Sequence, residues 1–455
     1  MATNSIGTVT NNTIEDHPFT PFMRKLTIFT AGGPFLDGFI MTIIGTALIQ
    51  LGPQLNLDTF WTALAGASAL LGLLLGGGIF GYITDIYGRQ LMYEIDLAAI
   101  IILSIMQMFI DAAWQLVLLR FLMGIAVGAD YPIATSLLAE FSPRKHRAKM
   151  LGFLSCSFYA GAVAAGFAGY LLLNVGPSGW KWMLGLPAIP ALILVAGRWG
   201  TPESPRWLLG RGRKEEALAV LKKVYGEQAK LSDLEQEPNQ TVRYSKLFAP
   251  GYLQRTFFVV SFWTLQIAPL YAIYTFGPQL LGVLGFSEGN SSIIGYTIIT
   301  FFFFFGCIPP LWWINSYGRR PVIILGFVVM TISMLILGLV KDPAIEIIVV
   351  CFALYAFFSG GPNILEWIYP NELFPTEVRA SAVGFGTAVT RISAAACTFG
   401  LPFALESLGV SSVMLICAGM SLLGVFICYA LAPETKGLSL AQASSIDYKP
   451  SKVKK

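Results

Sequence analysis

Five ionisable side chains stand out inside long apolar stretches of this chain, where charge is costly. They are two aspartates, one glutamate and two arginines: Asp37, Asp130, Glu366, Arg120 and Arg391. If these stretches cross a membrane, as their length indicates below, each charge costs roughly 2.5–3.5 kcal/mol or more at mid-depth. A charge kept at that cost usually carries protons or ions, or binds a charged solute. These residues are therefore the first candidates for function.

Asp37 and Arg120 are an acidic and a basic residue whose types and positions suit a switch controlled by a proton. Asp37 lies thirteen residues beyond Arg24, which is about 20 Å along an α-helix. Arg120 belongs to another apolar stretch. A carboxylate and a guanidinium on facing helices would neutralise each other, and protonation of Asp37 would release the pair. A permanent structural ion pair is the alternative interpretation.

Asp130 lies ten residues beyond Arg120 in the same stretch. We interpret it as a further proton-coupling residue or as the partner of Arg391. Any proton relay within the apolar stretches has to depend on carboxylates, because the chain has only two histidines, His17 and His146, and both lie outside those stretches.

Polar and aromatic side chains in three later stretches are candidates for binding a solute. They are Gln266, Tyr271, Tyr274, Asn363, Glu366, Trp367 and Arg391. Arg391 lies twelve residues beyond Arg379, deep enough to meet a substrate carboxylate, which arginine binds through two parallel hydrogen bonds. Packing between helices is the alternative role for the aromatic residues. The set predicts a small organic anion or zwitterion, and less readily a sugar.

Composition indicates a membrane protein. Hydrophobic residues make up 55% of the 455 residues and charged residues only 12%, about half the share of a soluble domain. A membrane-spanning helix needs about 20 apolar residues. Twelve such stretches are predicted, at 24–51, 59–84, 90–110, 112–139, 147–173, 179–199, 253–282, 290–314, 320–341, 344–372, 377–405 and 410–432. The expected fold is therefore an all-α membrane protein.

Basic residues predict the orientation. With both termini in the cytoplasm, the outward-facing connections carry only Lys181 and Lys341, as the positive-inside rule requires. The polar stretch 201–252 would then be a cytoplasmic linker with amphipathic helices, because its charges alternate with leucine and valine at helical spacing. It separates a bundle at 24–200 from one at 253–432, with tails at 1–23 and 433–455. The tail at 1–23 has no apolar core of a cleaved signal peptide.

Three motifs occur twice, with one offset. The pattern E-x-x-P-x-x-x-R-A-x-x-x-G begins at Glu140 and at Glu372, a Tyr-Gly-Arg turn ends at Arg89 and at Arg319, and a Pro-Glu pair ends at Glu203 and Glu434. The displacements are 230 to 232 residues. The chain is therefore a duplication of two parallel six-helix units.

These motifs resemble those of the major facilitator superfamily and its sugar-porter branch. The segments Gly81 to Arg89, Pro202 to Arg206 and Pro433 to Gly437 carry the resemblance. It implies two pseudo-symmetric six-helix bundles and transport by alternating access. The chain is also similar to uncharacterised bacterial inner-membrane metabolite transporters. Sugar–proton symporters of this branch have an aspartate and an arginine where this chain has Asp37 and Arg120.

The resemblance also bears on the substrate and on a cytoplasmic gate. Only Gln266 remains of the amides that hold hydroxyl groups in sugar porters, which argues against a simple hexose or pentose. The gate would be an ion-pair network between the two halves; capping of helix ends is the alternative. Its residues would be Asp85, Arg89, Glu140, Arg147, Glu203, Arg206, Arg319, Arg320, Glu372, Arg379 and Glu434.

Other functions are disfavoured by the sequence. All six cysteines lie in apolar stretches and no metal-ligand spacing occurs, so we expect no metal, no cofactor and no disulfide framework. The sequence contains no nucleophile–base set, so we do not expect an enzyme. The net charge of +4 reflects the membrane topology, so we expect no nucleic-acid partner. The expected partners are protons, a small solute and the lipid bilayer, bound by a monomer. A proton symporter is preferred over a proton-coupled exporter of a metabolite or drug, and over a nutrient sensor.

Overall fold

The computed structural model contains helices and no strands in the residues that it describes, which are 18–141, 144–233, 247–286, 291–374, 376–438 and 440–444. Within these ranges, some helical residues are described by their backbone alone. These are 81–82, 84–86, 89, 131–136, 139–140, 144–149, 151, 210, 233, 376–377, 379–381 and 440–441.

The first group of helices forms one bundle. Its members are α1 (Pro21–Gln54), α2 (Thr59–Tyr87), α3 (Arg89–Gln107), α4 (Ala113–Phe141), α5 (Arg144–Leu173), α6 (Gly179–Gly185) and α7 (Ala188–Arg198). Within it α2 packs on α4, α1 on α5, and α3 on both α4 and α7. The predicted single stretch 179–199 is divided between α6 and α7 at Pro187, because proline has no backbone N–H to continue the helical hydrogen bonds.

The second group repeats this arrangement. Its helices are α10 (Leu253–Val283), α11 (Ser291–Gly306), α12 (Pro310–Ser316), α13 (Arg319–Leu339), α14 (Ile345–Leu373) and α15 (Thr376–Leu431). The predicted stretch 290–314 is likewise divided, between α11 and α12, at Pro309 and Pro310. Conversely, the two predicted stretches 377–405 and 410–432 lie in one helix, α15, which is broken at Gly409 (φ 77°, ψ 166°).

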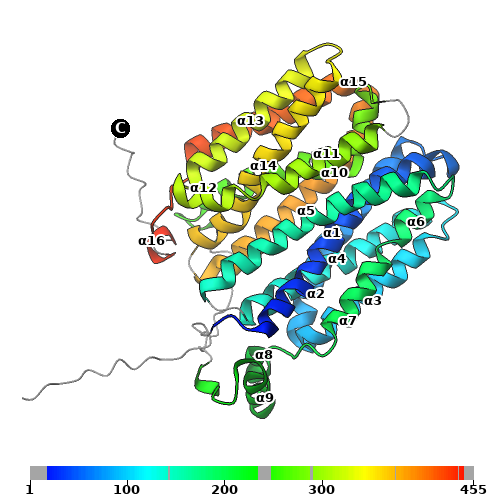
Figure 1. Cartoon of the computed structure of the whole chain (residues 1–455). Helices are drawn as coiled ribbons and strands as arrows, with labels where there is room; N and C mark the ends of the chain where they lie inside the picture. Colours follow the sequence, from blue (N-terminus) through cyan, green and yellow to red (C-terminus); the bar gives the residue numbers. More distant parts are fainter. Residues whose placement is uncertain are drawn as a thin grey trace, which may run out of the picture.

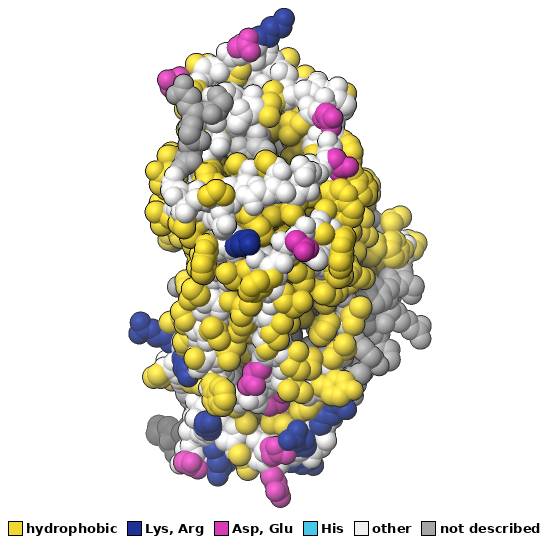
Figure 2. All heavy atoms as spheres, turned by 90° about the vertical axis from the view of Figure 1, so that its right-hand side faces the viewer, with side chains coloured by type: hydrophobic (Ala, Val, Ile, Leu, Met, Phe, Trp, Pro, Cys, Tyr) yellow, Lys and Arg dark blue, Asp and Glu magenta, His cyan; other side chains and the backbone are white. Residues whose placement is uncertain are grey.

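Eleven helical stretches in the described part of the chain are long and apolar enough to cross a membrane. Because α15 is broken at Gly409, it supplies two spans, and the fold has the twelve that the sequence predicts. The two bundles lie side by side, as Figure 1 shows in blue to green and in green to orange. Figure 2 shows hydrophobic side chains over much of one face, with few charges across its middle.

Short helices gather at one end of the bundles. They are α8 (Pro205–Gly210), α9 (Lys214–Tyr225) and α16 (Leu440–Ser444), and α1 begins at this end (Figure 1). We call this the linker end, and the opposite end, where α1 finishes at Gln54, the distal end. On α9, a hydrogen bond from Arg213 lowers the pKa of Glu216. Both side chains are in water, so this pair contributes little to stability.

Close contact between α1 and α5 depends on two glycines. A Cβ atom on Gly38 would collide with the carbonyl oxygen of Phe158, and one on Gly161 would collide with that of Phe35. Both obstacles are backbone atoms, which cannot move aside as a side chain can. Small residues of this kind let membrane helices approach closely, where van der Waals packing holds them together.

We expect Gly38→Ala to reduce the stability of the protein by about 1–3 kcal/mol, the usual cost of overpacking, because α1 and α5 have to separate. The measurement is the thermal unfolding midpoint of the purified protein in detergent. Gly52→Ala on the same helix is the matched control, because a Cβ atom there meets nothing within 4 Å. Equal midpoints for the two variants would contradict this account of the packing.

Candidate functional site

Asp37 lies between the two bundles in the middle of α1. Its side chain is 7% exposed, and its Oδ1 atom has no hydrogen-bond partner. The charges that act on it most strongly are Arg391, on α15 of the other bundle, and Asp130, on α4. Asp37 is thus a buried acid that faces a cation across the boundary between the bundles.

The expected ion pair between Asp37 and Arg120 is not formed among the described residues. The Nη1 atom of Arg120 donates to the carbonyl oxygen of Ile40 at 2.9 Å, and its Nε and Nη2 atoms have no partner. Ile40 follows Asp37 by three residues, so the guanidinium binds α1 within one helical turn of the carboxyl group. The two residues are brought near each other without contact.

Arg391, Tyr271 and Asp37 form the centre of the site. The guanidinium of Arg391 lies over the ring of Tyr271, with 5.3 Å between its Cζ atom and the ring centroid. Both Arg391 and Asp37 act electrostatically on the Tyr271 hydroxyl, as does Glu366. Helices α1, α10, α14 and α15 therefore contribute one polar side chain each to this group, and three of these helices belong to the second bundle.

Glu366 and Asn363 bind each other on α14. The Nδ2 atom of Asn363 donates to Oε1 of Glu366 at 2.8 Å, and Oε2 of Glu366 has no partner. Both side chains are buried. Since the two residues are separated by one turn, this contact fixes the glutamate without using a second helix.

Gln266 and two tryptophans lie nearer the linker end on α10 and α14. Gln266 is fully buried, and both polar atoms of its amide lack a hydrogen-bond partner among the residues that the structure describes. The rings of Trp263 and Trp367 meet edge to face, with centroids 5.6 Å apart. A buried amide with unused donor and acceptor is unusual, because buried polar groups are normally hydrogen-bonded.

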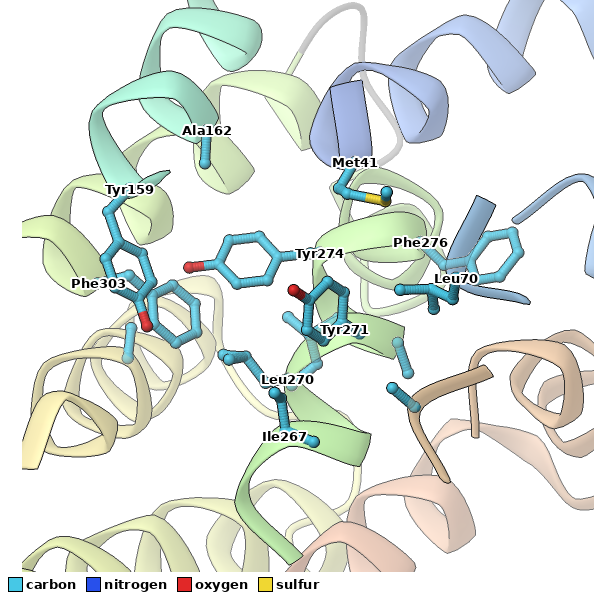
Figure 3. Packing of buried hydrophobic residues seen from close by; sticks show 14 of the residues in the cluster. Met41, Leu70, Tyr159, Ala162, Ile267, Leu270, Tyr271, Tyr274, Phe276 and Phe303 are labelled. Atoms are coloured by element: carbon cyan, nitrogen blue, oxygen red, sulfur yellow. The ribbon is translucent and has the colours of Figure 1, made fainter. Parts of the chain in front are cut away.

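Tyr274 belongs to an aromatic cluster between the bundles. Figure 3 shows the Tyr274 side chain pointing toward Tyr159 and Phe303, with Tyr271 to its lower right in this view. Its ring centroid lies 6.2 Å from that of Tyr159 and 5.0 Å from that of Phe303. The hydroxyl of Tyr274 has no hydrogen-bond partner, so the residue combines helix packing with one unused polar atom.

Asp130 does not pair with Arg391, its expected partner. Its Oδ1 atom accepts a hydrogen bond from Nη1 of Arg198, at the end of α7, at 2.9 Å. Asp96 on α3 lies 3.9 Å from the same nitrogen. Asp130 is in the first bundle, where α4 packs on α3, and Arg391 belongs to the second bundle, so the nearer cation binds it. Asp96 and Arg198 are not among the site residues expected from the sequence, although both are ionisable and lie inside predicted spans.

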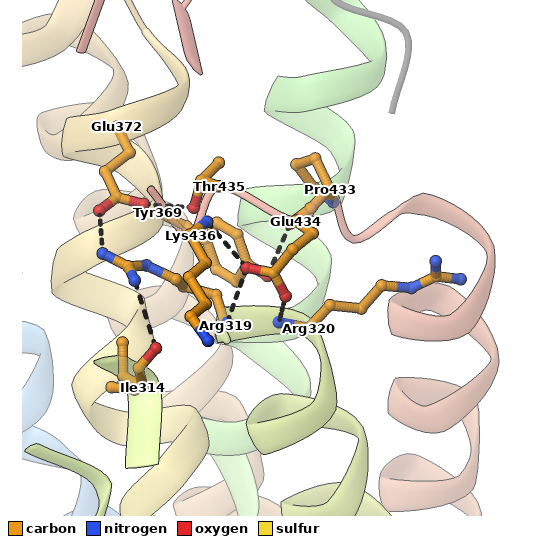
Figure 4. Close-up of polar contacts among 9 residues, drawn as sticks. All are labelled: Ile314, Arg319, Arg320, Tyr369, Glu372, Pro433, Glu434, Thr435 and Lys436. Carbon is orange, nitrogen blue, oxygen red and sulfur yellow. Dashed lines mark hydrogen bonds and ion pairs between the residues drawn. The ribbon is translucent and has the colours of Figure 1, made fainter. Parts of the chain in front are cut away.

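The charged motifs of the second half lie at the linker end, as Figure 4 shows. Nη2 of Arg319 donates to Oε1 of Glu372 at 2.9 Å. Glu434 accepts hydrogen bonds from the backbone N–H groups of Arg319, Arg320 and Lys436 at 3.0, 3.1 and 2.9 Å. A carboxylate at the first N–H groups of a helix satisfies donors that have no partner within the helix.

The first half repeats this cap at the equivalent position. Glu203 accepts a hydrogen bond from the backbone N–H of Gln90 at 3.1 Å. Gly88 and Gly318, which precede the two capped helices, have φ values of 102° and 101°. A Cβ atom at either position would also collide with the capping carboxylate, so these turns require glycine. Arg206 lies in the first turn of α8.

For Arg319, Arg320 and Glu372, the expected network between the halves stays a prediction. Their described contacts all join helices of the second bundle, because α13 packs directly on α14 and α15. Five other gate candidates have side chains outside the described part of the structure. They are Asp85, Arg89, Glu140, Arg147 and Arg379.

The polar contacts described between the bundles lie toward the distal end. Nε2 of Gln279 donates to the carbonyl oxygen of Gly45 at 2.6 Å. Oγ1 of Thr59 donates to Oε2 of Glu406 at 2.6 Å. A Cβ atom on Gly45 would collide with the carbonyl oxygen of Thr275, so α1 and α10 touch through their backbones there. The bundles are closed against each other at this end.

Comparisons with known proteins agree along nearly the whole chain. The family model described as "Sugar (and other) transporter" matches residues 26–446. The chain is 46% identical to the YaaU protein of Escherichia coli (strain K12) over 432 residues, which is 95% of this chain and 97% of that protein. It is 33% identical to the inner membrane metabolite transport protein YgcS of the same strain, over 95% and 96% of the two chains.

The fold is similar to that of a solved transporter. The xylose transporter XylE from E. coli, in a partially occluded inward open conformation, superposes with a TM-score of 0.77 at 20% identity. The match covers 92% of this chain and 100% of that one.

We expect Glu434→Ala to reduce the free energy of unfolding by about 1–3 kcal/mol, because three backbone N–H groups lose their acceptor. The measurement is thermal unfolding in detergent. Glu346→Ala is the control, because Glu346 is an exposed acidic residue in the first turn of α14. A loss no greater than that of Glu346→Ala would show that the cap does not stabilise the fold.

Proposed function

Because this chain belongs to the sugar (and other) transporter family of the major facilitator superfamily, we propose that it imports a small carboxylate-bearing metabolite together with a proton. The observation that carries the proposal is the placement of Arg391 beside Tyr271 and Asp37, at the boundary between the bundles. A solute bound there contacts both bundles, which is what alternating access requires of a transport site.

The side chains around Arg391 support a carboxylate as the substrate group. A guanidinium holds a carboxylate by two parallel hydrogen bonds, and the ring of Tyr271 orients it from one face. Gln266 adds a buried donor and acceptor for a second polar group of the solute. Glu366 supplies a buried carboxyl group whose Oε2 atom has no partner among the described residues and suits a solute that carries an amino group as well. These features favour an organic anion or a zwitterion over a neutral sugar.

Asp37 is our candidate for the coupling proton. A protonated Asp37 is neutral and leaves Arg391 available to the solute, whereas an ionised Asp37 competes with the solute for the same guanidinium. Arg120, bound to Ile40 one turn away, is the second cation that Asp37 can pair with after its proton leaves. Proton binding and solute binding thereby favour each other, as symport requires.

We also propose that the linker end faces the cytoplasm of the inner membrane, with both termini on that side. The distribution of lysine and arginine supports this orientation. Closure of the bundles at the distal end then corresponds to an inward-facing conformation.

Arg391→Gln is expected to weaken binding of a carboxylate substrate about 10- to 150-fold, because a charged hydrogen-bonding group is worth about 1.5–3 kcal/mol. The substrate is first identified by thermal-shift binding of the purified protein to a panel of neutral sugars, organic acids and amino acids. The control Lys341→Gln removes an exposed cation and should bind as the natural protein does. Ligands confined to neutral sugars would refute the carboxylate assignment.

Asp37→Asn is expected to abolish accumulation of the substrate driven by a proton gradient in proteoliposomes. Counterflow exchange should persist, because it needs solute binding and the conformational change but no net proton movement. Loss of both activities would make Asp37 structural. The natural protein is also tested with the proton gradient reversed. If it accumulates the substrate inside the proteoliposomes only when protons flow outward, it is an exporter that exchanges the substrate for protons.

A further inference from the structure

A second group of buried charges lies inside the first bundle, apart from the central site. Its members are Asp96 on α3, Asp130 on α4 and Arg198 at the end of α7. Nη1 of Arg198 lies 2.9 Å from Oδ1 of Asp130 and 3.9 Å from Oδ2 of Asp96. The three side chains are 1–5% exposed.

Arg198 is held in place by three helices. Its Nη1 atom donates to the carbonyl oxygen of Tyr93 and its Nε atom to that of Phe29, both at 3.3 Å. Its guanidinium lies 3.5 Å from the centroid of the Tyr93 ring, and the Tyr93 hydroxyl donates to Thr30. The cation is therefore fixed in position and belongs to the interior of the bundle.

The charges of this group do not balance. Two ionised carboxyl groups and one guanidinium leave one negative charge in excess. Among the residues whose side chains are described, the other ionisable groups that act on them are the Tyr93 hydroxyl, which is neutral, and Asp37 on α1, which adds negative charge when ionised. An uncompensated charge in a buried, apolar region costs several kcal/mol, and a carboxyl group avoids the cost by keeping its proton.

The geometry of Asp96 offers a position for that proton. Its Oδ1 atom accepts a hydrogen bond from the N–H of Leu97 at 2.6 Å, whereas Oδ2 has no hydrogen-bond partner. The carboxyl groups of Asp96 and Asp130 approach the same guanidinium nitrogen, at 3.9 and 2.9 Å. Two ionised carboxylates are both acceptors and repel each other, so a hydrogen bond between them requires a proton on one of them.

We propose that Asp96, Asp130 and Arg198 form a proton-binding site in which the two carboxyl groups share one proton. The site is separate from Asp37 but adjacent to it. A Cβ atom on Gly33 would collide with Oδ2 of Asp130, and Gly33 lies on the same face of α1 as Asp37, four residues earlier. The shared proton is thus about one helical turn nearer the linker end than Asp37. The site itself does not depend on the proposed substrate or on symport.

The test uses the proton as the only ligand. Infrared spectra of the purified full chain in detergent are recorded at neutral pH, where exposed carboxyl groups are ionised and only retained protons give a carboxylic-acid band. The natural protein should show such a band for the Asp96–Asp130 pair. Asp96→Asn should lose it, because one carboxylate then remains opposite one guanidinium and the charges balance.

Asp130→Asn should lose the same band for the same reason, and it serves as the second variant if Asp96→Asn does not fold. Glu94→Gln is the matched control, because Glu94 lies two residues from Asp96 on the exposed face of α3. It should keep the band. Asp37→Asn should keep the component of the band that the Asp96–Asp130 pair gives, whether or not Asp37 contributes a component of its own. A band of undiminished intensity in both Asp96→Asn and Asp130→Asn, or complete loss of the band in Asp37→Asn, would overturn the proposal. Neither outcome depends on transport, so the proposed function is judged separately.

Discussion

Burial of charge in an apolar surrounding is the constraint on which the interior of this protein depends. Each ionisable side chain between or within the bundles needs an opposite charge, a hydrogen-bond partner or a proton. Arg198 meets this need with Asp130 and backbone carbonyl groups, and Arg120 meets part of it with the carbonyl of Ile40. In the described part of the structure, the Oδ1 atom of Asp37 has no hydrogen-bond partner, so this need is not met there by a fixed contact.

The two halves share their helix caps but differ in their interior. Glu203 and Glu434 accept from the N–H groups of the helices that follow Gly88 and Gly318, and the two glycines have nearly the same φ. Each cap joins the segment that follows the last span of a bundle to another helix of that bundle. The central site is unequal, because the first bundle supplies Asp37 whereas the second supplies Arg391 and Tyr271. Relative movement of the two bundles would therefore change the distance between an acid and a cation.

Much of the fold could be predicted because membrane spans are set by local composition. Twelve apolar stretches, the repeated motifs and the basic linker are properties of short segments. Helix breaks were less predictable, since Pro187 and Pro309 interrupt helices whereas Pro34 and Pro269 lie within α1 and α10. Whether a proline breaks a helix depends on neighbouring helices that hold the turns on either side.

The sequence alone indicated five residues that carry charge into the apolar spans, although Asp96 and Arg198, which also lie within predicted spans, were missed. It also determined the twelve-span plan and the repeated caps. Only the tertiary structure decided the partners. Asp130 binds Arg198 instead of Arg391, and Asp37 faces Arg391 instead of pairing with Arg120. Such pairs depend on helix rotation and on which helices are neighbours, and these follow from the packing of the whole bundle rather than from any one stretch.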